Sequence, residues 1–252
     1  MSVSGPSSAA AGWVPTDSTA ELWLDAGDAT TVTLNSGVQQ LDDKSGNDRH
    51  ATQNTPSQRP AYDAVNGALD FPDQTGDRME GTWPSSVITG DWVWAMVIDW
   101  TNLGGGGGYN TFFQFGTSDT AMNLWHYNNA SWKVLQMYVN SGGAATETAL
   151  STNTAPGKFL LSATKSGSDW EVFKNGTSTC SGTRAIGTIT GTQTWTLMDG
   201  GLSTATNPMG KMHEMAMVSV LSDRQKLEGY LAWHNGIQAS LPIGHPYKDA
   251  AP

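Results

Sequence analysis

Asp91-Trp-Val-Trp-Ala-Met-Val-Ile-Asp-Trp100 carries apolar side chains at both odd and even positions. Because side chains alternate between the two faces of a β-strand, this run predicts a strand that is covered on both faces. Five glycines, Gly104 to Gly108, interrupt the chain, and Thr111-Phe-Phe-Gln-Phe115 follows as the next strand. The glycine run indicates a slack connection, since a phosphate-binding loop would need Lys, then Ser or Thr, and a helix. We therefore expect a central strand within two stacked sheets.

Alternating segments separated by turn signals continue along the chain and predict further strands. These segments cover residues 122–127, 132–139, 158–165, 170–174, 194–198 and 212–220. Asn175-Gly176 is a strong signal for a tight hairpin turn after the fourth of them. No helical pattern lies between the strands, so the spacing predicts an all-β fold with antiparallel sheets.

One short C-terminal helix, over about residues 222–235, is the exception to the β pattern. Ser222 is expected to be its N-cap, with Gln225 completing a capping box and Gly236 ending the helix. The helix carries a single apolar stripe with which it is expected to pack on the sandwich. The stripe consists of Leu227, Tyr230, Leu231 and His234.

The two ends of the chain show contrasting patterns. Residues 1–16 are small and polar and predict a flexible or partner-bound arm. Ala20-Glu-Leu-Trp-Leu-Asp25 then alternates, with Leu22 and Leu24 on one face. After the helix, Leu241-Pro-Ile-Gly-His-Pro-Tyr247 is expected to wrap back in extended form, because its prolines prevent regular structure. With no internal repeat, residues 17–252 are interpreted as a single domain.

Composition restricts the classes of function. The net charge is −10 with only 13 Lys and Arg, which argues against nucleic-acid binding. No segment approaches the ~20 apolar residues that span a bilayer, and the start lacks the pattern of a signal peptide. Cys180 is the single cysteine, so an internal disulfide is impossible, and we expect it to be buried.

The motifs at the two ends carry a resemblance. The chain starts with Glu21-Leu-Trp-Leu-Asp-Ala-Gly-Asp28, Leu41-Asp-Asp-Lys-Ser-Gly-Asn-Asp-Arg-His50 and Arg59-Pro-Ala-Tyr62. It finishes with Leu221-Ser-Asp-Arg-Gln-Lys-Leu-Glu-Gly-Tyr230 and Ser240-Leu-Pro-Ile-Gly-His-Pro-Tyr247. In this order they resemble the laminin-G-like, concanavalin A-like lectin/glucanase domains found in bacteriophage tail and virion structural proteins. The resemblance implies a two-sheet jelly roll that adheres or assembles and does not cleave.

The function expected from the resemblance is that of a non-enzymatic bacteriophage virion protein in a tail, fibre or capsid surface. It would be made in the host cytoplasm, form a homo-oligomer in the particle, and bind host-surface glycan or other virion subunits, without membrane insertion. A capsid decoration protein with no glycan affinity is the alternative. A polysaccharide-degrading enzyme is a third possibility, but none of the six Glu stands in the Glu-x-Asp-x-Glu or Glu-x-Asp-x-x-Glu pattern of β-glucanases.

Aromatic and amide side chains supply the candidate glycan or partner site. The segment Trp125-His-Tyr-Asn-Asn-Ala-Ser-Trp132 combines rings that stack on sugars with amides that orient hydroxyl groups. For each ring, packing in the core is the alternative interpretation. The candidate residues are Trp125, Tyr127, Asn128, Asn129, Trp132, Trp100 and Tyr109.

Aspartates in two neighbouring N-terminal turns supply a candidate calcium site, because calcium prefers carboxylate oxygens mixed with backbone carbonyls. The candidate ligands are Asp25, Asp28, Asp43 and Asp48. The alternative is that these carboxylates hydrogen-bond their own turns, as Asx residues commonly do. No other cofactor is expected.

Overall fold

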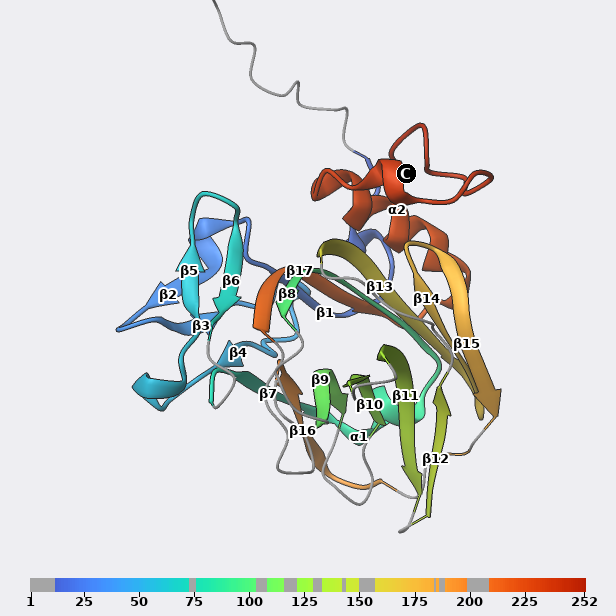
Figure 1. Cartoon of the computed structure of the whole chain (residues 1–252), viewed down its shortest axis with the longest axis horizontal. Helices are drawn as coiled ribbons and strands as arrows, with labels where there is room; N and C mark the ends of the chain where they lie inside the picture. The colour runs from blue at the N-terminus through green and yellow to red at the C-terminus, as the bar shows by residue number, and fades with distance from the viewer. Residues whose placement is uncertain are drawn as a thin grey trace, which may run out of the picture.

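The computed structural model describes residues 12–72, 76–102, 108–115, 122–128, 133–141, 144–149, 157–183, 185, 189–198 and 209–252. Within these ranges the chain forms two antiparallel sheets that pack face to face, with a short C-terminal helix on one side (Figure 1). This confirms the all-β, two-sheet sandwich that the alternating segments predict.

The first sheet runs in the order β15-β14-β13-β8-β17-β6-β5, and β1 also pairs with β17. Its strands are β1 (Ala20–Asp25), β5 (Ala61–Asp63), β6 (Ala68–Phe71), β8 (Trp92–Asn102), β13 (Gly157–Ser166), β14 (Asp169–Lys174), β15 (Thr177–Thr183) and β17 (Met209–Val218).

The second sheet runs in the order β12-β11-β10-β9-β16-β7-β4-β3-β2. Its strands are β2 (Val32–Leu34), β3 (Val38–Leu41), β4 (Ala51–Thr52), β7 (Met79–Pro84), β9 (Gly108–Phe115), β10 (Met122–Asn128), β11 (Lys133–Ser141), β12 (Ala144–Ala149) and β16 (Thr192–Leu197).

Strand β8 is buried on both faces, as its sequence predicts. Trp92, Trp94 and Met96 point into the core between the two sheets, where Trp94 stacks on Phe113 of β9. The intervening side chains, Val93 among them, belong to a separate apolar cluster that helix α2 (Arg224–His234) covers from outside. The two-sided apolar run therefore reflects a strand with a sheet on one face and a helix on the other.

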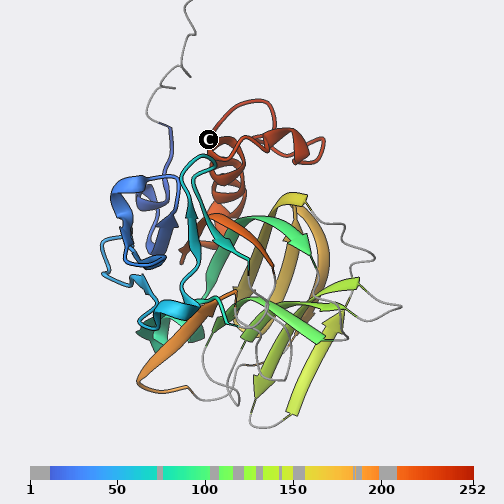
Figure 2. The same cartoon turned by 60° about the vertical axis from the view of Figure 1, so that its left-hand side comes forward.

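Helix α2 lies against the face of the first sheet that is turned away from the second sheet (Figures 1 and 2). Leu227 and Leu231 are fully buried in the cluster beneath it and Tyr230 packs against it, which confirms this part of the predicted stripe. His234 does not belong to it: its side chain is 47% exposed and lies against Glu214. The predicted start of the helix is wrong: Ser222 lies in a 3₁₀ turn, Leu221–Asp223, and α2 begins at Arg224 after Asp223. The Asp223 N–H donates to the Val220 carbonyl, so a tight turn takes the place of the expected first helical turn.

The hairpin between β14 and β15 turns at Asn175-Gly176, with φ angles of 51° and 75°. Positive φ at both central residues is the geometry of a type I′ turn, and the prediction is confirmed. A further short helix, α1 (Ser85–Thr89), connects β7 to β8.

The C-terminal tail wraps back over α2 as expected, but through tight turns, such as the one closed by His245 N–H and the Pro242 carbonyl, and not in the expected extended form. The indole N–H of Trp233 donates to the Tyr247 carbonyl at 2.8 Å, and Leu241 is buried beneath the helix. Trp13 and Val14 pack against the same cluster, so the domain includes residues that precede residue 17. Residues 1–11 of the expected arm lie outside the described residues. Among the helices that the structure describes, none is long and apolar enough to cross a membrane.

Candidate functional site

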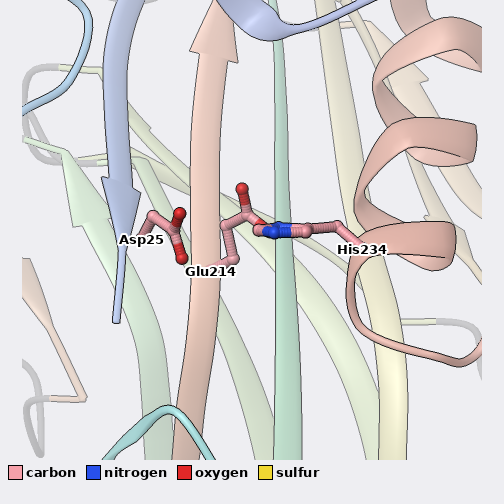
Figure 3. Close-up of side chains that lie close together, drawn as sticks. All are labelled: Asp25, Glu214 and His234. Carbon is pink, nitrogen blue, oxygen red and sulfur yellow. The ribbon is translucent and has the colours of Figure 1, made fainter. Parts of the chain in front are cut away.

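A buried polar cluster joins the two ends of the chain beneath α2. Asp25 comes from β1, Glu214 from β17 and His234 from the end of α2, and Figure 3 shows the three side chains side by side. One ligand atom from each lies within 4.8 Å of the others. Among the described residues, these three are the acidic and imidazole side chains that lie close enough together to hold a metal ion.

Glu214 is 1% exposed, and protein donors surround its carboxylate. Oε1 accepts a hydrogen bond from the indole Nε1 of Trp23 at 2.9 Å. Oε2 accepts one from the Asn235 side-chain amide at 2.8 Å and lies 2.7 Å from His234 Nδ1. A buried carboxylate that receives several hydrogen bonds is satisfied without a metal ion.

Lys44 supplies the positive charge on the other side of this cluster. Its Nζ lies 2.8 Å from Asp25 Oδ2 and 3.0 Å from Asp28 Oδ2, and 4.5 Å from the centre of the Trp23 ring. Hydrogen bonds from Thr30 and then from Lys44 lower the pKa of Asp28 to about 2. A calcium ion would have to displace the Lys44 ammonium group, so these side chains do not fit the ion as they are arranged.

The other two calcium candidates, Asp43 and Asp48, form no ion pair with Lys44 among the described contacts. The Asp43 carboxylate accepts hydrogen bonds from the backbone N–H groups of Trp23, Ser45 and Arg49, as an Asx residue does. Asp48 is exposed and has a positive φ of 55°. Of the four aspartates, the structure therefore brings Asp25 and Asp28 together, and both bind the Lys44 ammonium group.

His234 gives this cluster a measurable pH dependence. The hydrogen bond with Glu214 raises the pKa of His234 above its ordinary 6.5. A raised pKa means that the contribution to stability is complete below pH 6.5 and is lost as the pH rises through the folded-state pKa. We expect the free energy of unfolding to fall above pH 6.5 by no more than about 1 kcal/mol, because the side chain is 47% exposed. Urea unfolding between pH 6 and 9 measures this fall, and His234→Asn should flatten it; an identical slope in the variant would contradict the assignment.

The structure separates Trp100 from the other residues proposed for glycan binding and brings four of these onto the paired strands β9 and β10. Trp100 is 1% exposed and packs edge-on against Phe112 and Phe159, so its ring lies in the core and presents no face to a sugar. Tyr109 and Tyr127 are directly paired across β9 and β10. Trp125 and Asn128 are also on β10, and their side chains, like those of Tyr109 and Tyr127, lie outside the description. Asn129 and Trp132 lie outside the described residues.

The structure contains an open groove that the sequence did not reveal. It has a volume of about 350 Å³ and lies on β13, β14 and β15, at one edge of the first sheet. Six polar side chains from the three strands line it: Thr164, Ser166, Asp169, Glu171, Ser181 and Thr183. The strand register explains the gathering, because Glu171 is paired with Thr164 on one side and Ser181 on the other.

This groove could have been suspected from one signal in the sequence. Polar residues alternate along Asp169-Trp-Glu171 and along Ser181-Gly-Thr183, which places them on one face of each strand. The register between the strands, which the sequence does not give, is what brings the two sets together. The groove can supply hydroxyl donors and carboxylate acceptors to a polar ligand.

Comparisons with known proteins support the fold. No protein-family profile and no curated protein sequence matches the chain. Among solved structures, the binding domain of botulinum neurotoxin DC in complex with rat synaptotagmin II is similar, with a TM-score of 0.59 and 11% identity over 85% of this chain. The same binding domain in complex with SialylT gives 0.57, with 10% identity over 81% of this chain. A Trypanosoma rangeli sialidase gives 0.55, with 11% identity over 81% of this chain.

The chain spans only part of these proteins: 51% and 48% of the two toxin chains and 31% of the sialidase chain. At these identities the likeness concerns the fold and carries no assignment of activity. Together with the paired sheets described above, it identifies the fold of the chain as a two-sheet antiparallel β-sandwich.

Proposed function

We propose that this protein is a non-enzymatic, glycan-binding component of a bacteriophage virion, and that the groove on β13–β15 is its binding site. The observation that carries the proposal is the groove itself, an open hollow of about 350 Å³ lined by hydroxyl and carboxylate groups. Sugars present many hydroxyl groups, and such a lining can both donate hydrogen bonds to them and accept hydrogen bonds from them. The groove is built on paired strands, which hold its side chains in place.

The contacts of the acidic side chains favour binding of a glycan without its cleavage. Glu214 and Glu228 are buried, and both oxygens of each carboxylate have hydrogen-bond donors. In the groove, Asp169 accepts a hydrogen bond from Thr183, and Glu171 accepts one from Ser178. We therefore expect no release of reducing ends when the protein is incubated with bacterial surface polysaccharides.

The virion context rests on the resemblance of the terminal motifs to phage domains. A host-surface glycan, or other subunits of the particle, would be the partner, and many copies on one particle would raise a weak single-site affinity. The decoration protein is the competing function. Stable assembly on particles together with no binding to any glycan would favour it.

Filling the groove is the direct test of its role. Ser181 is exposed on β15, so Ser181→Tyr adds a ring to the groove without entering the core. We expect this change to weaken glycan binding at least tenfold on a glycan array and in calorimetric titrations of the glycans that bind. Thr194→Tyr places the same ring on an exposed site of β16 in the other sheet and should leave affinity unchanged. Equal affinity in the two variants would show that glycans bind elsewhere, for example at Trp125 and Trp132.

A further inference from the structure

We infer that the groove selects glycans that carry only hydroxyl groups or a protonated amine, and that it excludes carboxylated sugars such as sialic acid. This inference rests on the proposed function, since it concerns the ligand class of the same groove. It is drawn from the charge and the free acceptor atoms of the groove lining.

Two carboxylates stand at the centre of the groove. Asp169 and Glu171 are two residues apart on β14, so their side chains share one face of the strand. On β15 the residues paired with them are Thr183 and Ser181, and on β13 they are Ser166 and Thr164. The acidic pair is therefore flanked on both sides by hydroxyl groups.

Each carboxylate has one oxygen that the described residues leave available. Asp169 Oδ1 accepts a hydrogen bond from Thr183 Oγ1 at 2.5 Å, and Glu171 Oε1 accepts one from Ser178 Oγ. No described residue donates to Asp169 Oδ2 or Glu171 Oε2. A carboxylate oxygen accepts hydrogen bonds only, so it can bind a hydroxyl or ammonium group of a ligand and repels another carboxylate.

The nearest lysine on β13 is turned away from this face. Lys165 stands between Thr164 and Ser166 in the sequence, but it is 4% exposed and its Nζ donates to the carbonyls of Thr89 and Gly90 at 2.9 and 2.8 Å. The described lining of the groove holds no Lys or Arg. The net charge of −10 adds to the repulsion of an anionic ligand.

Trp170, between the two acidic residues, faces the other way. Because side chains alternate along a strand, its ring points into the core between the sheets, where it is 4% exposed. Gly182 leaves space for this ring, because a Cβ at residue 182 would lie 2.4 Å from Trp170 Cζ2. The ring therefore fixes the position of β14 from the core side, and the polar side chains of the groove are left to contact the ligand.

Matched sugar pairs test the inference. Binding is measured by calorimetric titration with lactose against sialyllactose, and with glucose oligomers against glucosamine oligomers. We expect the wild-type protein to bind the neutral and amine-bearing sugars at least tenfold more tightly than the sialylated one. The double variant Asp169→Asn, Glu171→Gln should reduce this preference. Asp249→Asn changes the net charge at an exposed site in the tail and should preserve it.

The outcomes separate the inference from the function on which it rests. Binding of sialyllactose as tight as that of lactose, lost in Ser181→Tyr, would overturn the charge selectivity and leave the glycan-binding groove intact. Absence of binding to every sugar would overturn the proposed function itself. Arg184→Ala completes the set of variants, because Arg184 follows the groove residue Thr183 in the sequence and arginine binds carboxylates. If the wild-type protein prefers sialyllactose and this variant loses that preference, the inference is wrong.

Discussion

Replacing Glu228 by alanine is expected to lower the free energy of unfolding by about 3–5 kcal/mol, the range for removing one partner of a buried charge pair. Glu228 is 0% exposed and is held from three directions. Arg224 Nη1 lies 2.8 Å from both carboxylate oxygens, the Ser162 hydroxyl donates at 2.6 Å, and His245 Nε2 lies at 3.2 Å. The single carboxylate therefore connects α2 to β13 and to the C-terminal tail.

Urea unfolding monitored by tryptophan fluorescence measures the loss. Lys226→Ala is the matched control on the same helix, because the Lys226 side chain is 42% exposed; its Nζ lies 2.9 Å from Asp223 Oδ1. The control should lower the free energy of unfolding far less than Glu228→Ala does, because an exposed ion pair contributes little to stability. A Glu228→Ala variant as stable as the control would show that the tail and helix pack without this carboxylate.

Protonation of His213 is expected to destabilise the protein by about 3 kcal/mol between pH 6.5 and pH 4. Burial, followed by the charge of Lys158, lowers the pKa of His213 to about 4. Its side chain is 4% exposed, with Nδ1 3.3 Å from the Asn66 carbonyl oxygen, and Lys211 and Asp99 also act on it. Because the pKa is lowered, stability is complete above the unfolded-state value of 6.5 and is lost as the pH falls towards 4.

The free energy of unfolding in urea, measured at half-unit steps from pH 7.5 to 4, gives the size of this loss. His213→Phe removes the titrating group from the buried site and should flatten the acid side of the curve. His234→Asn should leave that side unchanged, since the pKa of His234 is shifted in the opposite direction. An acid loss that persists in His213→Phe would assign it to carboxylates instead.

Much of the fold could be predicted because local patterns and tertiary burial agree. The run from Trp92 to Ile98 predicts a two-sided buried strand, and the structure covers it with a sheet and a helix. Asn175-Gly176 predicts a tight hairpin turn, which the structure contains and which the positive φ angles identify as type I′. In both cases the signal is contained within a few consecutive residues, so no knowledge of distant partners is needed.

The start of α2 and the details of the site depend on contacts that consecutive residues do not encode. Ser222 has the side chain of an N-cap, yet the turn before Arg224 places Asp223 at that position. Asp25 and Asp28 have the spacing of calcium ligands, yet Lys44 lies between them after a loop of sixteen or more residues. The groove arises from the register of three strands, and none of its six polar residues is distinctive alone.

The contact between the first and last described segments has a consequence for engineering. The backbone N–H of Trp13 donates to the carbonyl of Pro252 at 3.1 Å, so these two positions are neighbours in space. A few linking residues could join them, and the chain could be reopened at the exposed turn that contains Val65. Such a circular permutant of residues 13–252 would keep every strand pairing described above, because a short distance between the two joined positions is the condition under which this rearrangement is tolerated.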